Sequence, residues 1–107
     1  MRKIPENIIK KMNKYPAFYV KVWAACFNIP AGKTSTYKQI AEKISAPKAA
    51  RAVGTALAKN PFAPIIPCHR VIRSDGKLGG YSASGGLKKK QEMIKYERET
   101  GKDASLD

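Results

Sequence analysis

The sequence predicts a mainly α-helical domain with one small β-hairpin. Apolar residues recur at helical spacing in four segments, and a proline-containing break separates the two central segments. A short apolar segment, a tight turn and a return segment follow them, as in a hairpin. Two helices joined by a short break and followed by a hairpin wing indicate a winged helix-turn-helix-like fold. With 107 residues, the chain is long enough for one hydrophobic core, so we expect a single domain over residues 1–107.

The N-terminal part contains a basic segment and a strongly patterned helix. Residues 1–15 are basic and polar, and we expect a short helix or a loose arm there. From Pro16 to Phe27 the helical spacing predicts a helix with one buried face, formed by Tyr19, Val22, Trp23, Cys26 and Phe27. Because Cys26 lies on this face, we expect it to be a small core residue and not a reactive thiol.

The next two helices form the helix-turn-helix. Thr34, Ser35 and Thr36 can cap a helix from Tyr37 to Ile44. The segment 45–47 breaks that helix, and its proline suits the first turn of a second helix, Lys48 to Lys59. The apolar stripe predicted for this second helix consists of Ala49, Ala52, Val53, Ala56 and Leu57.

The opposite side of this second helix is small except at one position. Arg51 lies there with Gly54, Thr55 and Ala58. A face of small residues allows the backbone to come close to a partner, such as a DNA groove, with one arginine projecting into it. An ordinary amphipathic helix with an incidental arginine is an equally good interpretation of this segment alone.

The C-terminal half is predicted to contain an extended segment, the hairpin and a long helix. Prolines at 61, 64 and 67 favour an extended, polyproline-like path. Residues 71–73 are predicted to be a strand, 74–77 a turn and 78–81 the return strand. The last helix is predicted from about Gly86 to Thr100, capped by Gly101, and residues 101–107 are expected to be a frayed tail.

The charge and the cysteine count restrict the function. The chain has 21 Lys and Arg against 8 Asp and Glu, a net charge of +13, which indicates a polyanionic partner such as nucleic acid. A solvated basic surface is the alternative. Two cysteines are too few for a disulfide scaffold, and no leader or transmembrane-length segment is present, so we expect an intracellular protein with free thiols and no membrane partner. With one histidine, Cys and His alone cannot form a closed four-ligand zinc site, and no metal is expected.

Reactive residue types concentrate at Pro67-Cys68-His69-Arg70. A thiol is nucleophilic only as its thiolate, which needs a nearby cation, helix N-terminus or base. Adjacent residues of an extended chain point to opposite faces, so a turn or a bridging water would be needed to couple Cys68 to His69. A carboxylate from elsewhere in the fold could orient His69. Alone, this pair is a weak indication, because such neighbours are often structural.

The segment Pro67–Ile72 resembles the active-site signature of the O6-alkylguanine-DNA alkyltransferases, also called methylated-DNA–protein-cysteine methyltransferases. The resemblance concerns the C-terminal active-site domain of that family and covers roughly residues 17 to 99. Other matching segments fall in the family's order and near its spacing: Val22-Trp23, Ile29–Thr34, Tyr37, Ala49–Gly54, Asn60-Pro61, Gly76–Tyr81 and Lys90 with Glu97.

The resemblance implies a role for each residue of the active site. Cys68 would accept the alkyl group, and His69 would act as its base through a water, with Glu97 completing the relay. Asn60 would brace the turn that leads to the active-site segment. Tyr37 would press on the target phosphate and help to protonate or polarise the departing guanine. The guanine pocket would be lined by Tyr81, Ser82, Pro67 and Val71.

The resemblance also implies how DNA would bind. The helix-turn-helix would enter the minor groove, and Arg51 would fill the gap left by a flipped nucleotide. Flipping is required because an O6 substituent inside a duplex cannot reach a buried thiol. The other expected DNA contacts are Tyr37, Thr36, Ala50, Gly54, Thr55, Lys48 and Lys59.

The sequence therefore predicts direct reversal of DNA damage: irreversible, single-turnover transfer of the alkyl group to Cys68. The expected partner is double-stranded DNA containing O6-alkylguanine, with no cofactor, and the protein is expected to be a monomer in the cytoplasm or nucleoid of a prokaryote, or in the nucleus of a eukaryote. Two other functions stay open. One is an alkyltransferase-like protein that flags the lesion without transfer, although such proteins lack a cysteine at the position of Cys68. The other is a winged-helix regulator in which Cys68 is structural or redox-sensing.

Two features depart from the family's pattern. Its members usually carry an additional N-terminal domain, for which 107 residues leave no room. The loop 81–87 is two residues longer than the common form, so the shape of the pocket and its tolerance of bulky alkyl groups are expected to differ.

Overall fold

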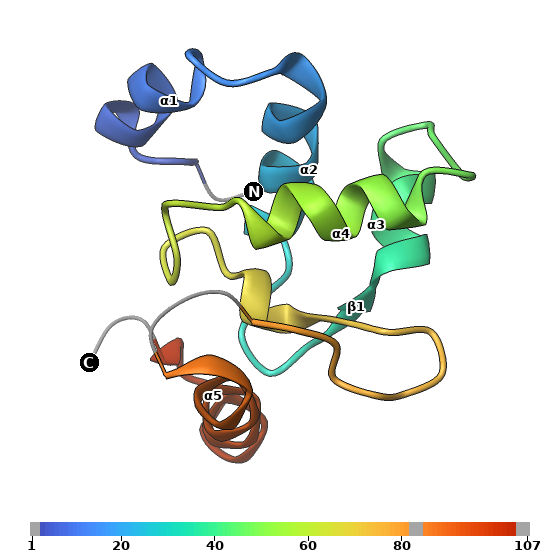
Figure 1. Ribbon diagram of the computed structural model, residues 1–107. Coiled ribbons are helices and arrows are strands. Elements are labelled where there is room, and N and C mark those ends of the chain that lie inside the picture. The colour runs from blue at the N-terminus through green and yellow to red at the C-terminus, as the bar shows by residue number, and fades with distance from the viewer. Residues whose placement is uncertain (1–2, 82–84, 105–107) are drawn as a thin grey trace.

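The computed structural model describes residues 3–81 and 85–104. It is mainly helical with a small two-stranded sheet, which confirms the predicted fold class (Figure 1). The elements in chain order are α1 (Glu6–Met12), α2 (Ala17–Phe27), β1 (Ser35–Thr36), α3 (Tyr37–Lys43), α4 (Ala50–Ala58), the 3₁₀ turn η1 (Cys68–Arg70), β2 (Val71–Ile72) and α5 (Gly86–Thr100).

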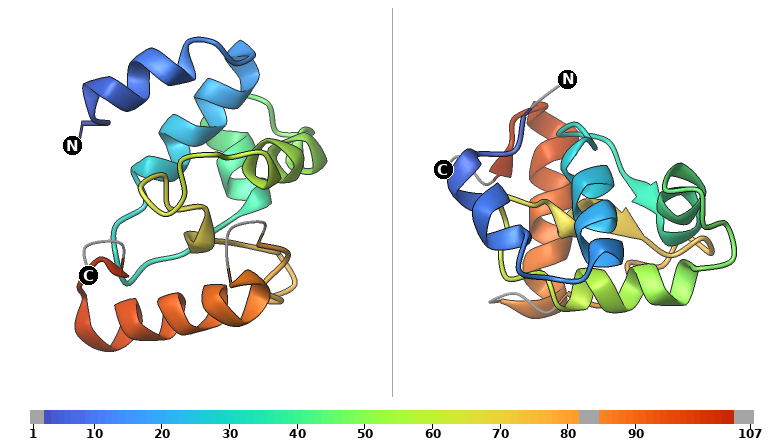
Figure 2. Two further views of the ribbon diagram at one scale, coloured as in Figure 1. Left: turned by 60° about the vertical axis from the view of Figure 1, so that its left-hand side comes forward. Right: turned by 90° about the horizontal axis from the view of Figure 1, so that it is seen from above.

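The small sheet and η1 lie between two groups of helices. α2, α3 and α4 pack on one another on one side, and α5 lies on the other side, against η1 (Figures 1 and 2). η1 contacts both α2 and α5, so it lies at the junction of the two groups. None of the helices in the described ranges is long and apolar enough to cross a membrane.

The core forms around Trp23, which is fully buried. Its indole Nε1–H donates to the Ala56 carbonyl at 2.9 Å and so connects α2 to the last turn of α4. The rings of Tyr15 and Phe62 meet its ring edge-on at 5.0 and 5.6 Å. Cys26 is completely buried in the same core, as the helical spacing predicts.

α3 and α4 form the predicted helix-turn-helix. α3 begins with a capping box, in which Thr36 Oγ1 accepts from the Gln39 amide at 3.0 Å and the Gln39 side chain accepts from the Thr36 amide at 2.9 Å. α4 begins at Ala50, two residues later than predicted. Residues 46–49 form a separate turn instead, closed by a hydrogen bond from the Ala49 amide to the Ala46 carbonyl.

The predicted β-hairpin is wrong in its pairing. β2 pairs in parallel with β1, with Ser35 opposite Val71, and residues 73–77 form only a tight turn closed by a bond from the Arg73 amide to the Lys77 carbonyl. The returning residues do not form a strand, and two of their carbonyls accept from a side chain of α5 instead. The ammonium group of Lys90, on α5, donates to the carbonyls of Val71, Leu78 and Gly80.

Two further expectations need correction. The proline segment is compact, because the Asn60 side chain bonds to both the Phe62 amide and the Ile66 carbonyl and so draws residues 60–66 into consecutive turns. The tail does not fray at Gly101. Residues 101–104 turn back along α5, and the Ala104 amide donates to the Glu97 carboxylate at 3.0 Å. Residues 105–107 lie outside the described part of the chain.

Candidate functional site

The turn η1 brings the reactive residue types together. The Cys68 amide donates to the Ile66 carbonyl, and the Arg70 amide donates to the Pro67 carbonyl. Because residues 68–70 are a 3₁₀ turn and not an extended strand, neighbouring side chains do not point to opposite faces. Cys68 is 7% exposed, whereas His69 and Arg70 are completely buried.

A buried carboxylate fixes the two residues that follow Cys68. Glu97, on α5, accepts from His69 Nε2 at 3.0 Å and from Arg70 Nε at 2.9 Å through Oε1, and from Arg70 Nη2 at 2.6 Å through Oε2. Arg70 also donates to the Ile29 carbonyl through Nη1 at 2.9 Å. An ionised carboxylate can only accept, so His69 must carry its proton on Nε2. Its Nδ1 is buried and has no hydrogen-bond partner within residues 3–81 and 85–104.

The electrostatics of this cluster keep Glu97 charged and His69 neutral. Burial alone would raise the pKa of Glu97, but hydrogen bonds from Arg70, from the Ala104 amide and from His69 outweigh it and hold that pKa below its usual value. Burial lowers the pKa of His69, although the neighbouring Glu97 charge opposes the shift. At neutral pH, His69 is therefore a neutral imidazole whose unprotonated Nδ1 can accept a proton.

Cys68 is a thiol in this environment, not a preformed thiolate. Burial raises its pKa, while a hydrogen bond from the Asn60 side chain and the charge of Lys90 act in the opposite direction. A cysteine of this kind needs a base at the moment of reaction. Burial raises the pKa of Cys26 further, so the second cysteine is the less reactive one.

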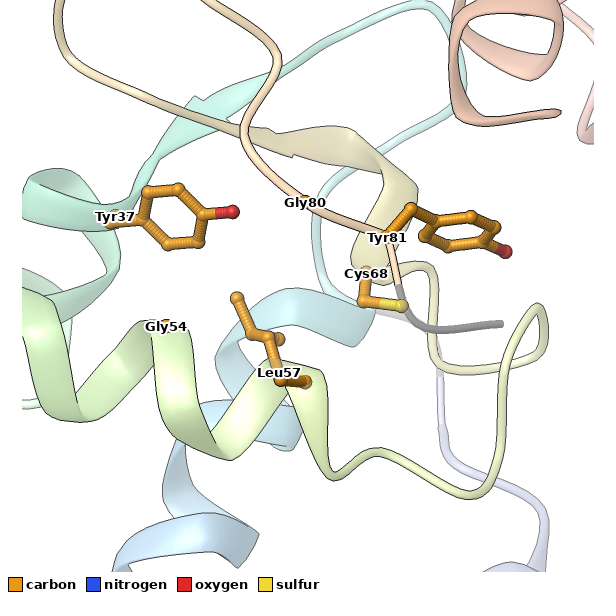
Figure 3. A pocket seen from close by; sticks show the side chains of 7 residues that line it. Tyr37, Gly54, Leu57, Cys68, Gly80 and Tyr81 are labelled. Carbon is orange, nitrogen blue, oxygen red and sulfur yellow. The ribbon is translucent and has the colours of Figure 1, made fainter. Parts of the chain in front are cut away.

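Cys68 opens onto a pocket of about 360 Å³. Figure 3 shows Tyr37, from the start of α3, and Tyr81, from the loop before α5, on opposite sides of this pocket, with Cys68 beside Tyr81. The volume lies within the range of small-molecule sites. The residues that line the pocket are Tyr37, Gly54, Leu57, Ala58, Cys68, Gly80 and Tyr81.

The two tyrosines differ in their contacts. The Tyr37 hydroxyl lies only 2.6 Å from where a Cβ at Gly79 would be, and Gly79 has a φ of 72°, so only glycine fits this approach. The Tyr81 hydroxyl points away from Tyr37 and donates to Met93 Sδ at 3.8 Å (Figure 3). Burial raises the pKa of both phenols, that of Tyr81 to about 12, so both hydroxyls keep their protons at neutral pH.

The expected DNA contacts lie along α3 and α4. Arg51 and Thr55 are exposed on α4, and Lys48 and Lys59 are exposed close to its two ends. Next to the Cys68 pocket, a more open groove contains Arg51 and shares Tyr37 and Gly54 with that pocket. Thr36 and Ala50 are half-buried at the first turns of α3 and α4.

The structure brings together some of the predicted site residues and not others. Cys68, Tyr37 and Tyr81 line one pocket, and His69 and Glu97 are hydrogen-bonded. Pro67 and Val71 are fully buried and are not among the described residues that line the pocket. Ser82 lies outside the described residues.

Sequence reasoning missed the partners of Glu97 and the walls of the pocket. Arg70 was visible in the Pro67–Arg70 motif as a charge within an apolar segment, which signals a buried ion pair. Leu57, Ala58 and Gly80 also line the pocket; the sequence placed Leu57 in the apolar stripe, Ala58 on the small-residue face and Gly80 in a matching segment, but did not assign any of them to the pocket.

Comparison with known families gives a direct match. The family described as "6-O-methylguanine DNA methyltransferase, DNA binding domain" matches residues 17–99, which is most of the chain. The chain belongs to this family. Two relatives named "Methylated-DNA--protein-cysteine methyltransferase" are similar to this chain. The relative from Mycolicibacterium paratuberculosis is 53% identical over 76% of this chain and 48% of its own length. The relative from Methanosarcina barkeri is 55% identical over 75% of this chain and 49% of its own length. The chain thus spans about half the length of these relatives.

Solved structures resemble most of this chain. "Mycobacterium tuberculosis OGT in complex with DNA" superposes with a TM-score of 0.76 and 46% identity, over 86% of this chain and 55% of that one. "S. pombe Atl1 in complex with damaged DNA containing O6-carboxymethylguanine" gives a TM-score of 0.67 and 38% identity, over 75% of this chain and 74% of that one.

The contacts of Lys90 generate a prediction about pH. Its pKa is about 8 in the folded protein, because burial opposes the charge, against 10.5 for an exposed lysine. As the pH rises from 8 to 10.5, the unfolded chain holds more protons at this residue than the folded one, so the free energy of unfolding should increase with pH. The contribution of Lys90 should be about 2 kcal/mol between pH 7.5 and 9.5.

Urea denaturation of the parent and of Lys90→Met at both pH values measures this contribution. The parent should gain about 2 kcal/mol more than the variant. Parallel changes in the two proteins would contradict the assignment of a charged, buried Lys90.

Proposed function

We propose that this chain is a DNA-repair protein that transfers the alkyl group of O6-alkylguanine in double-stranded DNA to Cys68, once per molecule. The observation that carries the proposal is the placement of a thiol in an open pocket, beside a buried neutral histidine whose Nε2 is anchored to Glu97 and whose Nδ1 is without a partner in the described chain. The names of the relatives agree with this chemistry.

The proposed reaction needs one proton transfer and one displacement. His69 Nδ1 takes the thiol proton of Cys68 through a water molecule, and the ion pair with Glu97 stabilises the resulting imidazolium. The thiolate sulfur attacks the alkyl carbon, a carbon–sulfur bond forms, and the bond from that carbon to guanine O6 breaks. Guanine leaves with the electron pair and takes up a proton at N1, which His69 ultimately resupplies. The thioether has no easy hydrolytic exit, so the protein reacts once.

Residues around the pocket would orient the base. Tyr37 keeps its phenolic proton at neutral pH and its hydroxyl points into the pocket, where it can donate to the departing guanine (Figure 3). Tyr81 is half-buried next to Cys68 and offers its ring face for stacking against a flipped base. Asn60 would position the thiol, since its side chain bridges the turn before η1 and also bonds to Cys68.

DNA would be bound across α3 and α4. The exposed side of α4 carries Thr55, Ala58 and Arg51, and Gly54 lies between the pocket and the neighbouring groove. We propose that this face enters the minor groove, that Arg51 replaces the flipped nucleotide, and that Lys48 and Lys59 pair with phosphates. The net charge of +13 supports such a partner, and two similar solved proteins are complexes with DNA.

Lesion recognition without transfer is the second candidate function. It is favoured by the similarity to Atl1, which was solved with DNA containing O6-carboxymethylguanine. Against it stands Cys68, because a thiol with a hydrogen-bonded relay has no purpose in binding alone. We therefore place transfer first, in one domain that acts as a monomer without a cofactor.

Incubation with a duplex that contains O6-methylguanine should add the mass of one methyl group to the intact protein. Peptide mapping should locate the group on Cys68 and not on Cys26, and excess DNA should give no second turnover. Glu97→Gln should slow transfer by roughly 10²–10⁴-fold, because His69 loses the charge that stabilises its protonated form.

Cys68→Ala is the control, since it should retain DNA affinity and gain no mass. Binding of the lesion by the parent without a gain in mass would reject transfer in favour of lesion recognition. An unchanged rate in Glu97→Gln would reject the relay.

A second experiment separates base flipping from chemistry. Arg51→Ala should slow repair of duplex DNA on the order of 10-fold or more, because the gap in the stack is then unfilled. Reaction with free O6-benzylguanine should keep the parental rate, since a free base needs no flipping.

Lys48→Ala is the matched control, and it should weaken binding to all DNA and reduce the salt dependence by about one unit. If Arg51→Ala loses equal rate on both substrates, Arg51 supports the pocket and does not replace the base.

A further inference from the structure

The four residues after α5, Gly101 to Ala104, close over the charged cluster; we name this segment the C-terminal clasp. Gly101 ends the helix in the left-handed region with a φ of 69°, and its amide donates to the Glu97 carbonyl at 2.8 Å. The chain then turns back from the end of α5 (Figure 2). Neither Asp103 nor Ala104 belongs to the part of the chain that the family matches, residues 17–99.

The clasp makes one contact to each of the two charged groups behind His69. Asp103 Oδ1 lies 3.0 Å from Arg70 Nη2, and the Ala104 amide donates to Glu97 Oε2 at 3.0 Å. The side chain of Asp103 is 14% exposed, so this ion pair is largely shielded from water. The clasp therefore contacts Arg70 Nη2 and Glu97 Oε2, whereas His69 Nε2 donates to Glu97 Oε1.

These contacts complete the hydrogen bonding of Glu97. Oε1 accepts from His69 and from Arg70 Nε, and Oε2 accepts from Arg70 Nη2 and from Ala104. A carboxylate with two donors on each oxygen has a single favoured orientation. Without the Ala104 amide, Oε2 loses one donor, and without Asp103, Arg70 carries a charge that Glu97 alone must balance.

We propose that the C-terminal clasp is a positioning element for alkyl transfer, which holds Glu97 and Arg70 in the one arrangement that keeps Glu97 Oε1 on His69 Nε2. This inference rests on the proposed function for its effect on rate. Asp103 and Ala104 do not touch the pocket that Cys68 opens onto, so they act through Glu97 and Arg70. At metal-bound histidines, a comparable arrangement, the loss of such outer partners typically changes activity by about 10–100-fold.

Two substitutions test the two contacts separately. Asp103→Asn removes the charge that faces Arg70, and Ala104→Pro removes the amide donor to Glu97. Each should lower the rate of methyl transfer at saturating DNA by about 10-fold and leave the DNA dissociation constant unchanged. Asp103→Glu should restore most of the rate.

Each substitution has a matched control. Glu99→Gln makes the same change in net charge at an exposed position of α5, and Ala104→Ser retains the amide N–H. Both controls should transfer at the parental rate.

A second measurement does not depend on transfer. Solvent exchange of the Nε2–H proton of His69, the only histidine, reports whether its bond to Glu97 is held. Exchange should be faster in Asp103→Asn and Ala104→Pro than in the parent and the controls.

The outcomes separate the two proposals. A parent that binds the lesion and transfers no methyl group removes the proposed function, and the exchange rates then decide alone whether the clasp holds His69. Where the parent does transfer, parental transfer rates in Asp103→Asn and Ala104→Pro overturn the positioning role. Slower transfer with unchanged exchange also overturns it, since the effect would not pass through His69.

Discussion

The buried ion pair between Glu97 and Arg70 is the interaction on which the site depends. It joins α5 to η1, and through the Ile29 carbonyl it also reaches the loop after α2. Charges without water are costly unless they are paired, so removing either partner should destabilise the fold by about 3–5 kcal/mol. The same pair fixes the carboxylate that orients His69. Stability and chemistry therefore share one set of contacts.

α5 supports the site with two buried charged residues on one face. Lys90 and Glu97 are seven residues apart, which is about two helical turns. Glu97 fixes the histidine, while Lys90 gathers three carbonyls of the segment 71–80 and so positions the loop that carries Tyr81. The positive charge of Lys90 also partly offsets the effect of burial, which raises the pKa of the Cys68 thiol. α5 therefore positions both His69, the proposed base, and the loop that carries Tyr81, which lines the pocket.

Local sequence patterns predicted most of the fold, whereas they could not predict contacts between residues that are far apart in the sequence. Helical spacing identified α2 with its buried Cys26, and the bounds of α5 are those that its spacing and Gly101 predicted. The parallel pairing of β1 and β2 joins residues 35–36 to residues 71–72, and Lys90 contacts the carbonyls of Leu78 and Gly80; both contacts link residues far apart in the sequence. The Pro67–Arg70 motif pointed to Cys68 and His69, yet the role of Arg70 became visible only with Glu97 in place.

The central claim is that His69 is neutral because it is buried, and that Glu97 holds its proton on Nε2 and so leaves Nδ1 unprotonated and able to act as a base. Because the chain has a single histidine, ¹⁵N NMR of histidine-labelled protein gives one unambiguous pair of ring signals. Between pH 6.5 and 8, we expect a protonated Nε2 and an unprotonated Nδ1, and a pKa of His69 below the usual value for histidine. An imidazolium at neutral pH, or a proton on Nδ1 with Nε2 unprotonated, would contradict it.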